Sequence, residues 1–334
     1  MRPSPLLKDQ PPRQILIRRV KRRLKLLGLL VACVVAVLAI IYLAAPQWLL
    51  RAAEMYQAQR AHLSEKSVQA GDTRWVYYEG GNRNGPTLVL LHGYMGNKEA
   101  WLPMASYLAS NFHLVIPDLP GWGESSRIAN ADYGYAAQAK RLRQFVDALH
   151  PGAIAVAGHS MGGAIAGLYA AEYPRDVGAL ILIDSTGVPF KENAFTRDLA
   201  AGHNRFDLHT RADFDRLESD LFVHPPWLPG RIKDVFVDRA VRDRDFDDRV
   251  LRAIAGPGQR NVLTAALPKV TAPTMAIWCR QDQIIDVSAL DAIRAGLKSA
   301  PKIGVTEFSG CGHMSIMERA QEIADAITRF VLMP

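Results

Sequence analysis

The chain has 334 residues, of which 49% are hydrophobic and 22% charged, and this composition is that of a globular protein. Its formal net charge of +7 resides in a basic tail over residues 1–25, which holds nine Lys or Arg and one acid, Asp9. The tail therefore carries +8 and the rest of the chain −1. A folded part with so little net charge gives no support for a nucleic-acid-binding surface, and no nucleic-acid partner is expected.

The first element expected along the chain is a transmembrane helix over residues 26–45, "LLGLLVACVVAVLAIIYLAA". These residues carry no charge, and a helix of this length spans about 30 Å, the thickness of the hydrocarbon core of a bilayer. A cleaved signal peptide is the alternative. Its apolar core would be only about 7 to 15 residues long, and Pro46 is a poor residue to follow a cleavage site.

The charges on either side of this helix predict its orientation. Nine cations precede it, whereas Arg51, Arg60 and Lys66 are the cations in the 17 residues after Leu50. By the positive-inside rule the basic tail lies in the cytosol. The rest of the chain is then on the non-cytosolic side, which is the periplasm if the membrane is a bacterial inner membrane.

Small residues recur every four positions within the predicted span, at Gly28, Ala32 and Ala36. Such a spacing places them on one helix face, against which a second copy of the helix could pack to form a homodimer. Alanine is common in membrane spans, so a monomer stays the alternative. Residues 46–66 favour helix by propensity and are expected to form a juxtamembrane helix.

Residues 67–334 are expected to form one α/β domain. The stretch "SVQAGDTRWVYYEGG" predicts a hairpin with Gly71 and Asp72 at its turn. Apolar runs without a period of two, such as "PTLVLLHG" and "ALILIDSTG", then alternate with helical stretches, which predicts a mostly parallel sheet with helices on both faces. Residues from 190 to about 268 are charge-rich and helical in pattern, and we expect an inserted helical cap there.

The stretch "GHSMGG" lies between the apolar run "AIAVA" and the helical stretch "AIAGLYAAEYP". If these are a strand and a helix, the chain must reverse at Ser160 in a strained turn. Small residues at Gly158 and Gly162 then avoid a collision of their Cβ atoms with the crossing elements. This G-x-S-x-G spacing is typical of a nucleophile elbow. A glycine-rich loop that only turns the chain is the alternative interpretation.

A nucleophilic serine needs a base that is itself oriented by an acid, and after a nucleophile elbow these follow in the order acid, then histidine. Of the nine histidines, only His313 lies beyond the last predicted strands, because the others precede or adjoin Ser160 or fall in the predicted cap. Asp282 is the favoured acid because it lies closest to the end of the strand "TMAIWC". Asp286 and Asp184 remain alternatives.

The tetrahedral intermediate of such a reaction needs two hydrogen-bond donors for its oxyanion. We expect these to be the backbone N–H groups of Met161 and of Tyr94 in "LLHGYMG", with His92 and Gly93 shaping the loop. No cofactor is expected. No metal is expected either, because the sequence contains neither H-E-x-x-H nor paired C-x-x-C motifs.

The chain has three cysteines, Cys33, Cys279 and Cys311, which are too few for a disulfide framework. Cys279 and Cys311 each end a predicted strand, so a bridge between them is one interpretation. Two buried free thiols are the favoured expectation.

These motifs together resemble the α/β-hydrolase superfamily, and in particular its membrane-anchored monoacylglycerol lipases and related bacterial lipases and phospholipases A. The resemblance extends over about residues 68–334, through "HGYMGNKEAW", "IPDLPGWGESS", "GHSMGGAIAGLYAAEYP", "RQDQIIDVS" and "CGHMSIMER", and includes the anchor. It implies hydrolysis of a lipid ester through an acyl-enzyme on Ser160, with Asp282 as acid and His313 as base. A short-chain esterase or carbon–carbon bond hydrolase of the same fold, and a non-catalytic membrane module, are the alternatives.

Overall fold

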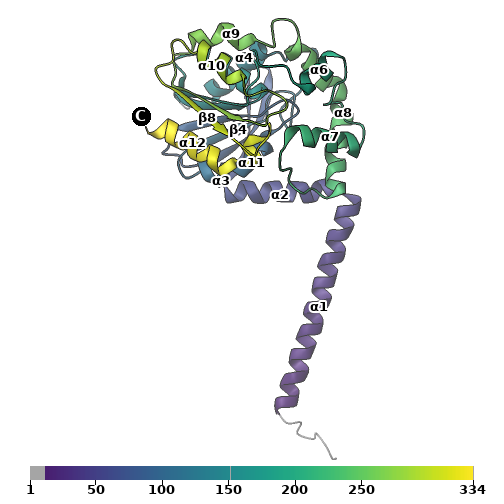
Figure 1. Cartoon of the computed structure of the whole chain (residues 1–334). Helices are drawn as coiled ribbons and strands as arrows, with labels where there is room; N and C mark the ends of the chain where they lie inside the picture. Colours follow the sequence, from purple (N-terminus) through teal and green to yellow (C-terminus); the bar gives the residue numbers. More distant parts are fainter. Residues whose placement is uncertain (1–11, 151, 334) are drawn as a thin grey trace, which may run out of the picture. The chain divides into compact units, whose positions relative to one another are not determined.

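The computed structural model describes residues 12–150 and 152–333 and divides into two units, Met1–Arg51 and Ala52–Pro334. The first unit contains helix α1 (Pro12–Ala44), drawn in purple in Figure 1. Its segment Leu16–Ala44 is, in the described part of the chain, the one helix long and apolar enough to cross a membrane. α1 thus includes nearly all of the span expected over residues 26–45 and continues back through part of the basic tail. Residues 1–11 of that tail lie outside the described residues.

The juxtamembrane helix expected over residues 46–66 is shorter in the structure, where α2 spans Pro46–Arg60. Strand β1 (Leu63–Ala70) begins three residues later and pairs antiparallel with β2 (Thr73–Gly81), Leu63 opposite Gly80. Pairing with the next strand of the hairpin therefore overrides the helical propensity of residues 63–66. The globular domain accordingly begins before residue 67. The hairpin turn lies at Gly71 and Asp72, as expected from the sequence.

An eight-stranded sheet forms the centre of the second unit, in the order β1-β2-β4-β3-β5-β6-β7-β8. β1, β2 and β4 pair antiparallel, whereas every pairing from β4 through β3 to β8 is parallel. The remaining strands are β3 (Thr87–Leu91), β4 (His113–Pro117), β5 (Ile154–His159), β6 (Val177–Ile183), β7 (Thr274–Cys279) and β8 (Ile303–Phe308). The mostly parallel sheet predicted from the continuous apolar runs is confirmed.

Helices cover both faces of this sheet, and β3 shows how each face is packed. Leu88 and Leu90 belong to one hydrophobic cluster, shared with α3 (Leu102–Leu108) and α12 (Ala320–Leu332). Val89 and Leu91 belong to the other, because successive strand residues point to opposite faces. The helices of that second cluster include α4 (Tyr135–Leu149), α5 (Met161–Glu172) and α10 (Ala289–Gly296).

Four α-helices lie between β6 and β7, in the segment 190–268 that we call the cap. They are α6 (Ala194–Ala200), α7 (Arg211–Leu221), α8 (Gly230–Ala255) and α9 (Val262–Ala266). Figure 1 shows α6, α7 and α8 gathered at one side of the sheet. Two residues of α8 contact Trp122 in the core. Asp247 Oδ1 accepts a hydrogen bond of 3.1 Å from the Trp122 indole, and Phe246 packs edge-on against the same ring. Three short helices complete the unit, namely η1 (Lys98–Trp101), η2 (Leu267–Lys269) and α11 (Ser315–Glu318).

Candidate active site

The turn from β5 into α5 is as tight as its glycines suggest. Ser160 has a φ of 55° and a ψ of −120°, a conformation that L-residues rarely adopt. A Cβ on Gly158 would lie 2.1 Å from the carbonyl oxygen of Gly162, and a Cβ on Gly162 would lie 2.4 Å from that of Leu91. Both distances are far below van der Waals contact, so only glycine fits at either position.

Ser160, His313 and Asp282 meet at the carboxyl ends of the strands. His313 Nε2 lies 2.9 Å from Ser160 Oγ, and His313 Nδ1 lies 2.8 Å from Asp282 Oδ2. The other carboxylate oxygen of Asp282 accepts the N–H groups of Ile284 and Ile285 at 2.8 and 2.9 Å. An ionised carboxylate only accepts, so Nδ1 carries the imidazole proton and Nε2 is left free to accept the serine hydroxyl.

The two alternative acids, Asp286 and Asp184, accept their hydrogen bonds from other residues than His313. Asp286 accepts the N–H of Ser288, in the manner of an ordinary loop carboxylate. Asp184 is fully buried and accepts hydrogen bonds from the N–H of Cys279 and the hydroxyl of Ser315. It therefore links the end of β7, before Asp282, to the residues that follow His313.

Burial is the largest influence on the pKa values of His313, Asp184 and Asp282. It lowers the pKa of His313 to about 3 and raises the pKa values of both Asp184 and Asp282, and the charge of Asp282 raises the pKa of Asp184 further. Asp282 accepts three hydrogen bonds and Asp184 accepts two, so a single negative charge on the pair is better stabilised on Asp282. The site thus pairs a neutral imidazole with a carboxylate that fixes its tautomer.

His159 was not expected to take part in the site. Its Nε2–H donates a hydrogen bond of 2.7 Å to the backbone carbonyl of His313, and its own pKa is lowered to about 3 by burial. A neutral His159 therefore holds the loop that carries His313. The two residues lie 154 positions apart, and no pattern in the sequence marks this contact.

The loop that follows β3 is held in place by His92. Its Nε2 accepts the N–H of Leu119 at 2.9 Å, so the proton resides on Nδ1, which donates to the carbonyl of Gly93 at 2.8 Å. A Cβ on Gly93 would lie 3.1 Å from that of Ser160, so glycine permits the close approach of this loop. Tyr94 and Met161 both line the cavity at Ser160, and Met161 begins α5, where an N–H has no acceptor within the helix.

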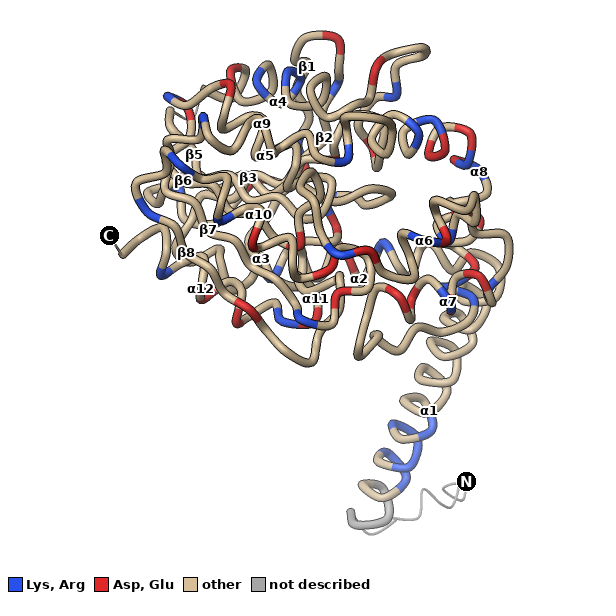
Figure 2. Tube along the Cα trace, turned by 45° about the horizontal axis from the view of Figure 1, so that its top comes forward, with Lys and Arg blue, Asp and Glu red and all other residues tan. Residues whose placement is uncertain are grey.

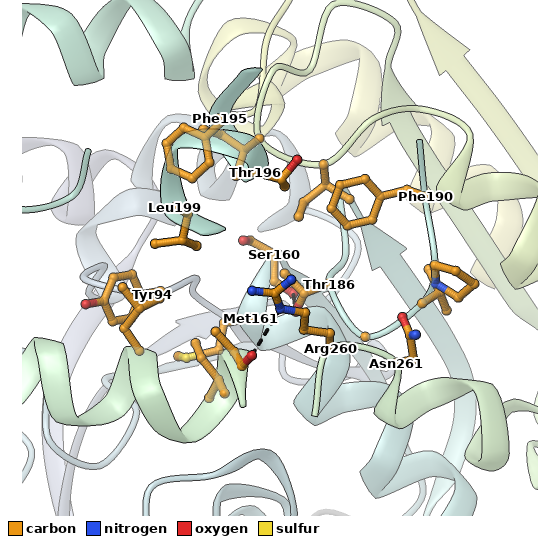
Figure 3. A pocket seen from close by; sticks show the side chains of 18 of the residues that line it. Tyr94, Ser160, Met161, Thr186, Phe190, Phe195, Thr196, Leu199, Arg260 and Asn261 are labelled. Atoms are coloured by element: carbon orange, nitrogen blue, oxygen red, sulfur yellow. Dashed lines mark hydrogen bonds between the residues drawn. The ribbon is translucent and has the colours of Figure 1, made fainter. Parts of the chain in front are cut away.

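Ser160 opens into a cavity of about 350 Å³ that lies between the strand ends and the cap. Most of its lining is apolar (Figure 3). The apolar residues are Met161, Val188, Pro189, Phe190, Phe195, Leu199, Phe206, Leu251, Ile254, Ala255, Ile284 and Ile285. Among residues 12–150 and 152–333, no group of three His, Cys, Asp or Glu side chains is arranged to hold a metal ion. Because its lining is mostly apolar, the cavity suits an acyl chain presented to Ser160.

Cys279 and Cys311 form a disulfide, so the expectation of two free thiols is wrong. β7 and β8 pair in parallel with Cys279 opposite Phe308, which brings Cys311 back beside the end of β7. The two Cα atoms are 5.5 Å apart, within the usual range for a bridge. The bridge joins the segments that carry Asp282 and His313. This proximity depends on strand register, which the sequence alone does not reveal.

Comparisons with known proteins agree with this geometry. The family model of the alpha/beta hydrolase fold matches residues 86–320. Lipase 1 of Psychrobacter immobilis is 34% identical over 281 residues, which cover 82% of this chain and 86% of the lipase. Monoacylglycerol lipase ABHD6 of Homo sapiens is 30% identical over 297 residues, 86% of this chain and 87% of the human protein.

Among solved structures, the crystal structure of a membrane phospholipase A, a bacterial virulence factor, is 35% identical to this chain with a TM-score of 0.82. The match covers 94% of this chain and 100% of the phospholipase. These matches confirm the family expected from the motifs: the chain belongs to the α/β-hydrolase family.

Proposed function

We propose that the protein hydrolyses carboxylic esters of lipids, with Ser160 as nucleophile, His313 as general base and Asp282 as the group that orients it. The observation that carries the proposal is the hydrogen-bonded chain from Asp282 through His313 to Ser160, with contacts of 2.8 and 2.9 Å. The apolar cavity at Ser160 supports a lipid substrate. So do the names of the relatives, which are a lipase, a monoacylglycerol lipase and a phospholipase A.

In the first half of the reaction, Ser160 Oγ attacks the ester carbonyl while His313 Nε2 takes the hydroxyl proton. Asp282 stabilises the imidazolium that forms, because its carboxylate accepts the Nδ1 proton. The N–H groups of Met161 and Tyr94 receive the oxyanion, and one such donor contributes about 3 kcal/mol of transition-state stabilisation. The C–O bond then breaks, the alcohol leaves with the proton from His313, and the acyl group stays on Ser160.

In the second half, water attacks the acyl-enzyme. His313 is again neutral and takes a proton from the water as its oxygen bonds to the acyl carbon. Collapse of the second tetrahedral intermediate returns the proton to Ser160 and releases the fatty acid. The burial that lowers the pKa of His313 keeps the imidazole in its basic form between these steps.

The direct test is lipid hydrolysis by the purified full chain and its Ser160→Ala variant. Long-chain monoacylglycerol, phospholipid and short-chain acetate esters are supplied in parallel, and products are followed by mass spectrometry. Ser219→Ala is the matched control, because Ser219 lies exposed on α7. We expect release of long-chain fatty acid by the wild type and the control, and its loss in Ser160→Ala. A sharp preference for acetate esters, or hydrolysis that survives in Ser160→Ala, would contradict the proposal.

The protein is membrane-associated, and for its topology we propose a single transmembrane helix with the basic tail in the cytosol and the hydrolase domain on the other side. Figure 2 shows the cations of the N-terminal part of α1, whereas both signs of charge are interspersed over the second unit. The Cys279–Cys311 bridge supports the same orientation, because structural disulfides persist in oxidising compartments. Reporter fusions at the C-terminus test it: an alkaline phosphatase fusion should be active, and an active cytosolic reporter would contradict it.

The anchor would keep the site beside its substrate, since acyl lipids partition into the bilayer. For the span itself we propose pairing of two copies through Gly28, Ala32 and Ala36. An added Cβ at Gly28 would meet no atom within 4 Å, so this face of α1 is open. Gly28→Ile should abolish chemical cross-linking of full-length copies in membranes, and cross-linking that persists would contradict the pairing.

A further inference from the structure

Two charged residues line the otherwise mostly apolar cavity at Ser160, namely Glu192 and Arg260. Glu192 lies just before α6 and Arg260 just before α9, so both belong to the cap. Figure 3 shows the Arg260 side chain pointing into the cavity that Ser160 also lines. The chemistry described above uses neither charge.

The Arg260 side chain is exposed at the cavity, and within residues 12–150 and 152–333 its guanidinium is held at one nitrogen. Its Nε donates a hydrogen bond of 3.0 Å to the carbonyl of Ala255, which fixes the plane of the group. In the described part of the chain, Arg260 forms no ion pair with a carboxylate. Its two terminal nitrogens therefore keep their N–H groups available to a ligand.

We infer that Arg260 binds the phosphate of a glycerophospholipid whose acyl ester lies at Ser160. This inference rests on the proposed function and narrows its substrate class. A planar guanidinium matches two phosphate oxygens with a pair of parallel N–H donors, and the amide of Asn261 lines the cavity beside it. Arg260 is the one cation among the described residues that line the cavity, and an anionic phosphate is therefore expected to bind at its guanidinium.

A neutral head group gains much less from this arrangement. The glycerol hydroxyls of a monoacylglycerol can accept hydrogen bonds from Arg260 but bring no opposite charge. Hydrogen bonds to a charged partner contribute about 1.5–3 kcal/mol, roughly twice those between neutral groups. At the lower end of this range, which suits a cavity open to solvent, the difference between a charged and a neutral partner, summed over the two parallel bonds of the guanidinium, corresponds to about a tenfold preference in kcat/KM.

The test compares lysophosphatidylglycerol with monoacylglycerol of the same acyl chain, in the same neutral mixed micelles. The measured quantity is the ratio of kcat/KM for the phosphate ester to that for the neutral ester. Arg260→Gln should lower this ratio about tenfold, and Arg260→Lys, which keeps the charge without the planar fork, should give an intermediate value. Raising NaCl from about 0.05 to about 0.5 M should lower the wild-type ratio but not that of Arg260→Gln.

Arg242→Gln is the matched control, because Arg242 is 68% exposed on α8 and does not line the cavity. Its ratio should equal that of the wild type. The inference is overturned if the ratio changes less than twofold in Arg260→Gln. An equal loss of kcat/KM on both substrates leaves the ratio unchanged in this way and would mark a structural role for Arg260. Either result leaves the proposed lipid hydrolysis intact, whereas persistence of hydrolysis in Ser160→Ala would refute the proposed function itself, so the two failures can be told apart.

Discussion

Loss of the Cys279–Cys311 bridge should destabilise the hydrolase domain by an amount that depends on the number of residues between the two cysteines. The two cysteines are 32 residues apart in the sequence. Closing a loop of that size removes about 12 cal/mol/K of entropy from the unfolded chain, or about 3.7 kcal/mol at 25 °C. Replacing both cysteines with alanine should therefore lower the free energy of unfolding by about 3–4 kcal/mol, a large part of the stability of a typical domain.

Urea unfolding of the full chain in detergent, followed by tryptophan fluorescence, measures this difference. Both sulfur atoms are fully buried, so the alanine pair also loses packing. Reduction of the wild-type chain separates the two effects, because the sulfur atoms remain. Cys33→Ala is the matched control, since Cys33 is exposed on α1 and not part of the bridge.

Activity should fall with the bridge, because it fastens the segments that carry Asp282 and His313. A displacement of about 1 Å between catalytic groups lowers rates by as much as a hundredfold. A thiol count on the denatured, unreduced chain gives the sharpest check. One reactive thiol, that of Cys33, is expected. A count of three, or an unfolding free energy that reduction leaves unchanged, would refute the reasoning.

Three further outcomes follow from the site. Because burial lowers the pKa of His313 below 6.5, kcat/KM should persist at pH 6 and fall only at lower pH. A pH profile of kcat/KM that already falls at or above pH 7 would contradict this. Asp282→Asn should reduce kcat about 10⁴-fold, because the wrong tautomer of the His313 imidazole is favoured. Its circular dichroism should remain native, and a loss of kcat below tenfold would contradict the role of Asp282. Gly158→Ala should destabilise the fold by about 2–3 kcal/mol in thermal unfolding, whereas Gly178→Ala, whose Cβ has its nearest neighbour at 3.7 Å, should not.

The features that were predictable from the sequence are those that local chemistry determines. Continuous apolar runs such as residues 180–183 predict strands buried on both faces, and the structure has strand β6 there. Gly158 and Gly162 mark the turn at Ser160 because a side chain at either position collides with backbone. Chain order alone singles out His313, since the histidine follows the acid in this fold.

The remaining features depend on contacts between distant segments. The Cys279–Cys311 bridge depends on the register of β7 and β8. The hydrogen bond from His159 to the carbonyl of His313 joins residues that are far apart in the chain. Arg260 carries no motif at all, and its significance comes from the cavity into which it points. None of these has a local signature.

The activation of Ser160 by His313 is tested most directly by one equivalent of a fluorophosphonate probe and peptide mass spectrometry. The probe reacts with serines whose hydroxyl is activated by a base. We expect one adduct, on the peptide that contains Ser160, and none in His313→Ala at the same exposure. An adduct on a different serine, or undiminished labelling of Ser160 in His313→Ala, would contradict the mechanism.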